Sequence, residues 1–158
     1  MIHIIEKDII WNTKNAGIIF NPVSVSDTVV GRRVFNNLLK ELHKDVYESY
    51  LDYVADEKEK KLLADVQLVK LKDNRVIMNG FVYKKDKIDL LSLTKCLVEL
   101  FNLAEEYNVD IAIPMYMGCK NPFTRKYIET IINTVFEDCK TNVYVYKVTP
   151  YCLNKNKH

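Results

Sequence analysis

The loop from Met115 to Phe123 contains the residues best placed to do chemistry. It follows an apolar run, Val109 to Pro114, that predicts a buried strand, and it precedes a stretch with helical periodicity. Open α/β sheets bind ligands at the carboxyl ends of their strands, and unpaired N–H groups at helix N-termini attract anions. The first ligand to expect at this loop is therefore a phosphate-bearing small molecule.

The cysteines and histidines do not form a metal-binding pattern. None of the four cysteines is in CxxC spacing, and none of the three histidines stands near them as a ligand. We therefore expect no metal site and no cofactor. Cys119 is the only cysteine in the ligand loop, where a packing role is favoured over a nucleophilic one. Because no secretion signal is recognisable, the thiols should be free in a reducing cytosol.

Composition places the chain among ordinary globular proteins. It has 158 residues, 48% hydrophobic and 28% charged, with a formal net charge of +2. We expect one domain at residues 1–150 and a polar tail at 151–158. The small, dispersed charge gives no strong case for nucleic acid or a membrane surface as partner. No apolar run approaches the roughly 20 residues of a membrane span, so a cytoplasmic location is predicted.

A mixed sheet covered by helices on both faces is the architecture that the periodicities predict. Helices are expected from apolar spacing after residue 34, as one long helix or two broken between His43 and Tyr50, then from Leu90 to about Asn108, and around Tyr127 to Phe136. Pro22 should end the second strand, because proline cannot donate to a ladder. Strands are expected at 2–7, 17–20, 66–71, 76–83, 109–114 and 142–148, with 66–83 forming a hairpin.

Four blocks of the sequence resemble the macrodomain family, and within it the terminal ADP-ribose protein glycohydrolase type. The most specific block runs from Ile111 through Gly118-Cys119 to Val135-Phe136 and Val143–Tyr146, with Pro114 and Val135-Phe136 at the family's spacing. The others are Glu6–Ile9, Gly17–Pro22 with Gly31, and the hairpin ending in Lys84-Lys85. Together they span nearly the whole chain in the family's order. The resemblance implies an α/β fold of three layers, α/β/α, with a mixed central sheet.

The resemblance also implies a groove for ADP-ribose or a related NAD-derived nucleotide at the C-terminal ends of the strands. Asp8, followed by Ile9, would accept a hydrogen bond from the adenine amino group. Gly31 would let the backbone approach a diphosphate, and Arg32 would add charge-assisted contacts. The second side of the diphosphate and the distal ribose would meet Met117, Gly118, Cys119, Lys120, Asn121 and Phe123. Plainer alternatives are a turn cap for Asp8, helix surface for Arg32 and core packing for Phe123.

The binding loops depart from the family pattern. The chain has only four glycines, and Thr28-Val29-Val30-Gly31 stands where the family normally has two or three. Side chains there would narrow or reshape the diphosphate groove. The family asparagine that positions the distal ribose corresponds to about Ser24, and Asn21 lies earlier on the same segment.

The catalytic residues of the related hydrolases are matched only in part. Those enzymes use a lysine that attacks the distal ribose, and Lys84 or Lys85 lies where it is expected. A nucleophilic lysine needs burial or a neighbouring cation, whereas an exposed lysine at a hairpin end is the alternative. The assisting aspartate corresponds to Asn121 or Pro122, and neither can act as a carboxylate base. Possible substitutes are Asp86 and Asp89.

Three functions follow as hypotheses. The first is binding of ADP-ribose or a related NAD-derived nucleotide, which needs a groove but no base. The second is an ADP-ribosyl hydrolase that acts on an ADP-ribosylated macromolecule or a small ADP-ribose derivative. The third is a degenerate macrodomain that serves as a protein-interaction scaffold. The composition, rich in Ile, Asn and Lys, is similar to that of proteins from AT-rich bacteria and their phages. It suggests a phage counter-defence role in the host cytoplasm against an NAD-derived signal.

Overall fold

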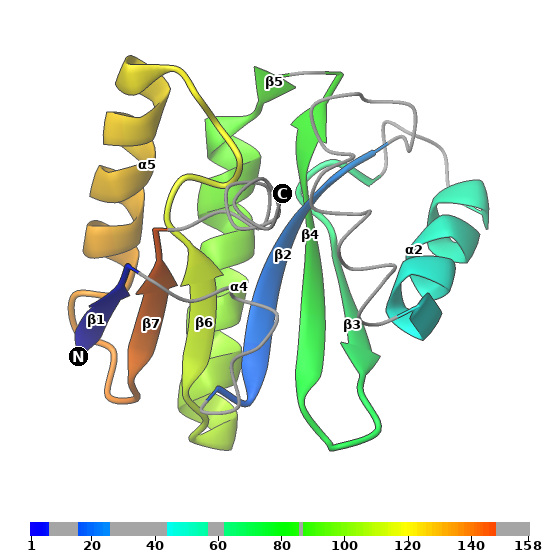
Figure 1. Ribbon diagram of the computed structural model, residues 1–158, viewed down its shortest axis with the longest axis horizontal. Coiled ribbons are helices and arrows are strands. Elements are labelled where there is room, and N and C mark those ends of the chain that lie inside the picture. Colours follow the sequence, from blue (N-terminus) through cyan, green and yellow to red (C-terminus); the bar gives the residue numbers. More distant parts are fainter. Residues whose placement is uncertain (7–15, 26–43, 57–61, 86, 148–158) are drawn as a thin grey trace, which may run out of the picture.

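A computed structural model describes residues 1–6, 16–25, 44–56, 62–85 and 87–147 (Figure 1). Within these ranges the chain forms a seven-stranded mixed sheet and three helices. The strand order is β1-β7-β6-β2-β4-β3, with the short β5 paired to β4. The strands are β1 Ile2–Ile5, β2 Ile18–Ser24, β3 Val66–Lys70, β4 Val76–Lys84, β5 Lys87–Ile88, β6 Ile111–Pro114 and β7 Val143–Tyr146.

The central strands all run in the same direction. β1, β7, β6, β2 and β4 pair in parallel, whereas β3 and β5 are antiparallel to β4. The carboxyl ends of β2, β4, β6 and β7 therefore meet along one edge of the sheet, which we call the C-terminal edge. The predicted hairpin of β3 and β4 is confirmed, with Val66 opposite Gly80 and Lys70 opposite Val76.

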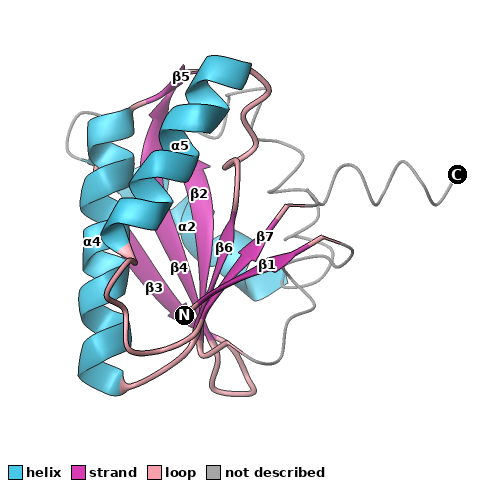
Figure 2. Cartoon of the chain, turned by 90° about the vertical axis from the view of Figure 1, so that its left-hand side faces the viewer, coloured by secondary structure: helices cyan, strands magenta, loops and turns pink. Residues whose placement is uncertain are grey.

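The helices cover both faces of the sheet, as Figure 2 shows. α4 Leu90–Tyr107 and α5 Pro122–Val135 lie on one face, and α2 Lys44–Asp56 lies on the other. The alternation of side chains along each strand explains this division. Phe20 and Val82 pack with Leu97 of α4, whereas Ile77 packs with Val46 of α2. The predicted three-layer α/β/α fold is confirmed.

The ends of α4 follow from its capping residues. Asp89 is the N-cap, and its carboxylate accepts hydrogen bonds from the backbone N–H and the hydroxyl of Ser92. Asn108 is the C-cap in the left-handed conformation, with φ of 52°, as predicted. An asparagine takes up that conformation more readily than most residues, so the helix ends there.

Strand β2 corrects one prediction. It continues through Pro22 to Ser24 rather than ending at the proline. The ladder between β2 and β6 contains only Ile18 and Ile19, whereas the ladder to β4 runs along all of β2. Among the described strands, Pro22 thus lies where β2 pairs with β4 alone, so the missing N–H removes no bond from the ladder with β6.

Candidate functional site

The loop between β6 and α5 contains a tight turn at the C-terminal edge of the sheet. The Cys119 N–H donates to the Tyr116 carbonyl at 2.7 Å, and the two central residues, Met117 and Gly118, have φ of 52° and 82°. Positive φ at both central positions defines a type I′ turn. Glycine adopts this conformation freely, but Met117 is strained in it. The predicted position of the loop, between a strand end and a helix start, is confirmed.

A buried tyrosine beneath the loop fixes the turn. Tyr83, at the end of β4, is fully buried, and its hydroxyl donates to the Met117 carbonyl at 2.5 Å. The same hydroxyl lies 3.0 Å from the Cys119 Sγ. Sequence reasoning missed Tyr83, because a tyrosine at the end of an apolar strand is equally typical of plain core packing. Only the tertiary structure brings it under a loop 34 residues away.

An arginine on α5 holds the next carbonyl of the loop. The Arg125 Nε donates to the Cys119 carbonyl at 2.6 Å, and its guanidinium stacks over the Tyr116 ring at 4.5 Å from the centroid. The Tyr116 hydroxyl in turn donates to Glu129 at 3.0 Å. Burial, and then the hydrogen bond to Glu129 and its charge, raise the pKa of Tyr116, so the phenol stays neutral and donates. Arg125 was also missed from the sequence.

The N-terminus of α5 differs from the expected anion site. Asn121 is the N-cap, and its side-chain oxygen accepts the N–H groups of Phe123 at 2.9 Å and Thr124 at 3.1 Å. Pro122 has no N–H, and the Arg125 N–H donates to the Asn121 carbonyl. The first turn of α5 therefore has no unpaired N–H left for an anion. In the loop, by contrast, the Gly118 N–H donates to no atom among the described residues.

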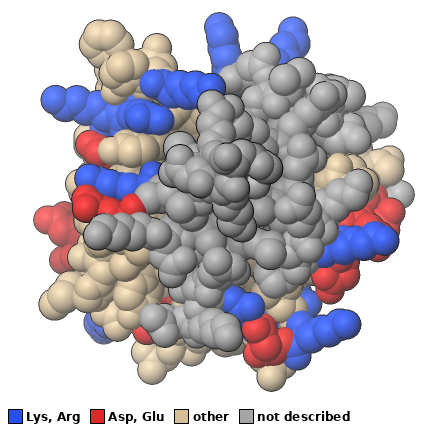
Figure 3. All heavy atoms as spheres, in the orientation of Figure 1, with Lys and Arg blue, Asp and Glu red and all other residues tan. Residues whose placement is uncertain are grey.

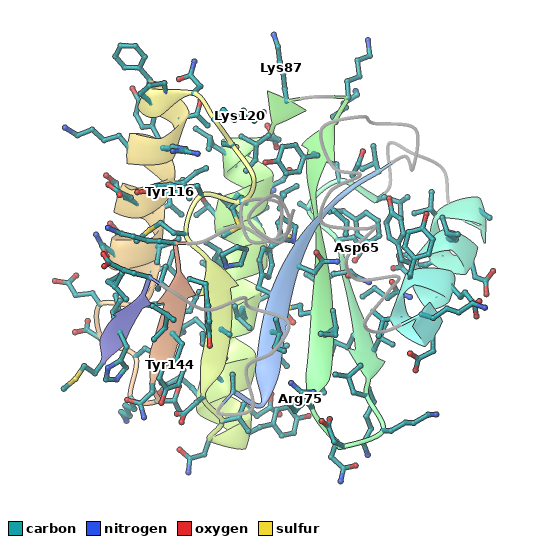
Figure 4. All side chains as sticks on the ribbon, viewed as in Figure 1. Asp65, Arg75, Lys87, Tyr116, Lys120 and Tyr144 are labelled. Atoms are coloured by element: carbon teal, nitrogen blue, oxygen red, sulfur yellow. The ribbon has the colours of Figure 1, made fainter. Side chains whose placement is uncertain are left out.

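Exposed lysines surround this end of the molecule. Lys84, Lys85 and Lys87 extend from β4, β5 and the residues between them, and Lys120 extends from the loop. Basic side chains stand out along the upper rim in Figure 3, and Figure 4 labels Lys87 and Lys120 there. Lys84 is exposed at the end of β4, beside Lys85 and Lys87. Its catalytic role stays a prediction.

Asn21 and Ser24 lie on β2 and are completely buried. The Ser24 carbonyl accepts the Tyr50 hydroxyl of α2 at 2.9 Å. The Asn21 side chain donates to Asn79 at 2.8 Å, as the first step of a chain of amides that continues to Gln67 at 3.0 Å. The Asn21 Oδ1 has no partner within the described parts of the chain. Ligand contacts of Asn21 and Ser24 therefore remain predictions.

The remaining residues predicted to bind the ligand or to take part in catalysis lie in several parts of the chain. Phe123 is 79% exposed on α5, so its core alternative is excluded. Asp89 serves as the N-cap of α4. Outside the described residues lie Asp8, Ile9, Gly31, Arg32 and Asp86. The structure thus joins the β6–α5 loop to the end of β4, but it does not test the contacts predicted for the adenine and the first side of the diphosphate.

The described residues were also compared with the requirements of a metal site, a membrane span and a surface pocket. They contain no group of three or more potential metal ligands, and none of their helices is long and apolar enough to cross a bilayer. A shallow hollow of about 520 Å³ lies between β1 and α5, lined by Ile2, Thr130, Asn133, Thr134 and Glu137. Because Ile2 begins β1 and Glu137 follows the end of α5, this hollow is not part of the C-terminal edge.

Comparison with solved structures relates this fold to known proteins. The Thermus aquaticus DarG macrodomain is similar with a TM-score of 0.71 and 17% identity, over 94% of this chain and 99% of that one. The Mycobacterium tuberculosis DarG macrodomain gives a TM-score of 0.72 and 14% identity, over 92% and 97%. Thermosipho africanus DarTG in complex with ADP-ribose gives 0.65 and 13%, over 89% of this chain and 43% of that one. The sequence itself matches no protein-family model and no curated protein.

Proposed function

From the macrodomain fold that this chain adopts, we propose that it binds ADP-ribose or a related NAD-derived nucleotide along the C-terminal edge of its sheet. The observation that carries the proposal is the type I′ turn after β6, whose Gly118 N–H is unused among the described residues. A phosphate oxygen is a suitable acceptor for such a group. A structural neighbour, Thermosipho africanus DarTG, was solved with ADP-ribose.

The surrounding charges support an anionic ligand. Lys84, Lys85, Lys87 and Lys120 are exposed at this end of the chain, although the net charge of the whole protein is only +2. They would raise the local concentration of a nucleotide and would make its binding sensitive to salt. We assign the adenine to Asp8 and Ile9, and the first side of the diphosphate to Gly31 and Arg32.

Calorimetry with ADP-ribose tests this proposal. The wild-type chain should bind ADP-ribose, and Gly118→Val should weaken binding at least tenfold, because a β-branched residue is strained at φ of 82°. Asn74→Val is the matched control: Asn74 has φ of 73° in the β3–β4 turn, away from the C-terminal edge. It should lose stability but keep its affinity. No measurable heat at millimolar ADP-ribose would leave the scaffold function as the better hypothesis.

Hydrolysis is the second candidate, favoured by the position of Lys84 at the end of β4 beside Lys85 and Lys87. Neither Asn121 nor Pro122 provides a carboxylate, so turnover would depend on a lysine nucleophile or a bound water. Release of ADP-ribose from a modified protein or nucleotide, lost in Lys84→Ala but kept in Lys95→Ala on α4, would establish it.

Such an activity in a host cytoplasm would suit a phage counter-defence protein. An infection assay against an NAD-signalling defence would test that setting.

A further inference from the structure

The direction of the Gly118 N–H is set by the carbonyl on the other side of the same peptide group. In a planar trans peptide the C=O and the N–H point in opposite directions. The Met117 carbonyl points toward the protein interior, where it accepts the Tyr83 hydroxyl at 2.5 Å. The N–H of Gly118 must therefore point away from Tyr83. The hydrogen bond from the buried Tyr83 hydroxyl thus contributes to the direction of this donor.

A second contact, from Arg125, fixes the orientation of a later peptide group in the loop. The Arg125 Nε holds the Cys119 carbonyl at 2.6 Å, which fixes the peptide between Cys119 and Lys120. Arg125 is itself held by stacking on Tyr116, whose hydroxyl is bound to Glu129. The carbonyls of Met117 and Cys119 are thereby both engaged by donors of the protein. This matters because an exposed carbonyl oxygen would repel an anion.

The turn needs such support because it is not a relaxed conformation. Met117 is a non-glycine residue at φ of 52°, a conformation that costs about 1–2 kcal/mol for an L-residue. Its side chain is fully buried in the main core cluster, so it cannot leave that conformation without disturbing its packing. Without the Tyr83 hydroxyl, the Met117 carbonyl would lose this hydrogen bond, and less of the strain would be offset.

We infer that Tyr83 is a positioning residue for the proposed nucleotide site, and that Arg125 assists it. The Tyr83 hydroxyl holds the Met117–Gly118 peptide so that the Gly118 N–H is directed at a phosphate oxygen of the ligand. This inference rests on the proposed function, because it assigns the turn to the phosphate-binding part of that site. It explains how a loop with one glycine can present a backbone donor where the family's loops are glycine-rich.

Tyr83→Phe is the decisive variant, because it removes one hydroxyl and keeps the buried ring. The Kd of ADP-ribose should rise about tenfold, which corresponds to the loss of one well-directed hydrogen bond. Binding of adenosine, which has no phosphate, should change less than about twofold under the same reasoning. The matched control is Tyr53→Phe, which removes a hydroxyl that donates to Asp65 at 2.6 Å, far from the loop in the sheet order.

A second measurement reports on the loop without ligand. In Tyr83→Phe the amide resonance of Gly118 in an ¹⁵N-correlated spectrum should shift and broaden, whereas Tyr53→Phe should leave it in place. Arg125→Lys, which keeps the charge but loses the planar fork, should weaken ADP-ribose binding at both low and high salt.

The outcomes separate the two proposals. If wild-type protein binds ADP-ribose and Tyr83→Phe binds it equally well with an unshifted Gly118 resonance, the role of Tyr83 is refuted and the proposed function stands. If wild-type protein does not bind ADP-ribose, the proposed function fails, and the positioning role fails with it. An equal loss of ADP-ribose and adenosine binding would show a general structural effect and would also refute the inference.

Discussion

Two hydrogen-bond networks stabilise different kinds of structure, one between regular elements and one in a loop. The first, which we call the amide ladder, runs across regular strands from Asn21 on β2 through Asn79 on β4 to Gln67 on β3, which donates to the Ser49 carbonyl of α2 at 3.1 Å. The second, which we call the loop pins, consists of the Tyr83 and Arg125 contacts to the carbonyls of Met117 and Cys119.

The direction of the amide ladder is fixed from one end. A main-chain carbonyl can only accept, so Gln67 must present its amino group to Ser49 and its oxygen to Asn79. Asn79 must then donate its amino group to Gln67, which leaves its oxygen to accept the amino group of Asn21. The Asn21 oxygen is unpaired among the described residues. The ladder joins elements that would be regular without it, whereas the loop pins hold a turn that contains a strained residue, Met117. The ladder should therefore govern stability, and the pins should govern binding.

Breaking the amide ladder should have the largest effect on stability. Asn79→Leu leaves a buried donor on Asn21 and an acceptor on Gln67 without partners, which should lower the free energy of unfolding by about 3 kcal/mol. Urea denaturation measures this loss. The double variant Asn21→Leu/Asn79→Leu should lose less than the sum of the single variants, because it removes both partners of one bond. Strict additivity would show that the ladder is not a coupled unit.

Two cysteines of the molecule, one on α4 and one in the loop, have different surroundings. Cys96 on α4 is buried, and burial followed by the charge of Asp65 raises the pKa of its thiol from 9.0 to about 12. The unfolded thiol ionises first, so the contribution of Cys96 to stability is complete below pH 9 and declines as pH rises toward 12, by up to about 1.4 kcal/mol per pH unit.

Alkaline unfolding compared between wild type and Cys96→Ala measures this contribution. The difference between the two proteins should change with pH only above pH 9. Thiol labelling at pH 8 offers a second contrast, because the half-buried Cys119 of the loop should react well before Cys96. Equal labelling rates would contradict the assigned burial.

Removing the N-cap of α5, at the boundary between the loop and the helix, should have a smaller effect on stability. Asn121→Ala removes the acceptor of two N–H groups and should cost about 1 kcal/mol in thermal or urea unfolding. Asn121→Asp keeps an acceptor and should cost less than half of that, because a carboxylate is also favourable at a helix N-terminus. Equal losses in both variants would mean that Asn121 does not act as a cap.

The exposed aromatic beside that cap should have the smallest effect on stability. Phe123→Ala should change the free energy of unfolding by no more than about 0.5 kcal/mol, because the side chain is 79% exposed. If Phe123 covers a ribose or base, as the resemblance implies, the variant should still weaken ADP-ribose binding. Unchanged affinity would remove Phe123 from the predicted ligand contacts.

The sequence alone determined the fold class and most of its elements, because hydrophobic periodicity and capping residues act locally. The hairpin of β3 and β4, the end of α4 at Asn108, and the placement of the β6–α5 loop all follow from short-range patterns. The run through Pro22 was not predictable in this way, because it depends on which neighbour pairs with β2 at that point.

Only the tertiary structure decided which N–H groups of the loop are unpaired among the described residues. The sequence predicted free N–H groups at the start of α5, but Asn121 and Pro122 leave none unpaired there. The Gly118 N–H points away from Tyr83, because Tyr83 from a distant strand holds the carbonyl of the same peptide. The orientation of a peptide in a turn depends on contacts between segments far apart in the chain, and no local pattern of residues encodes such contacts.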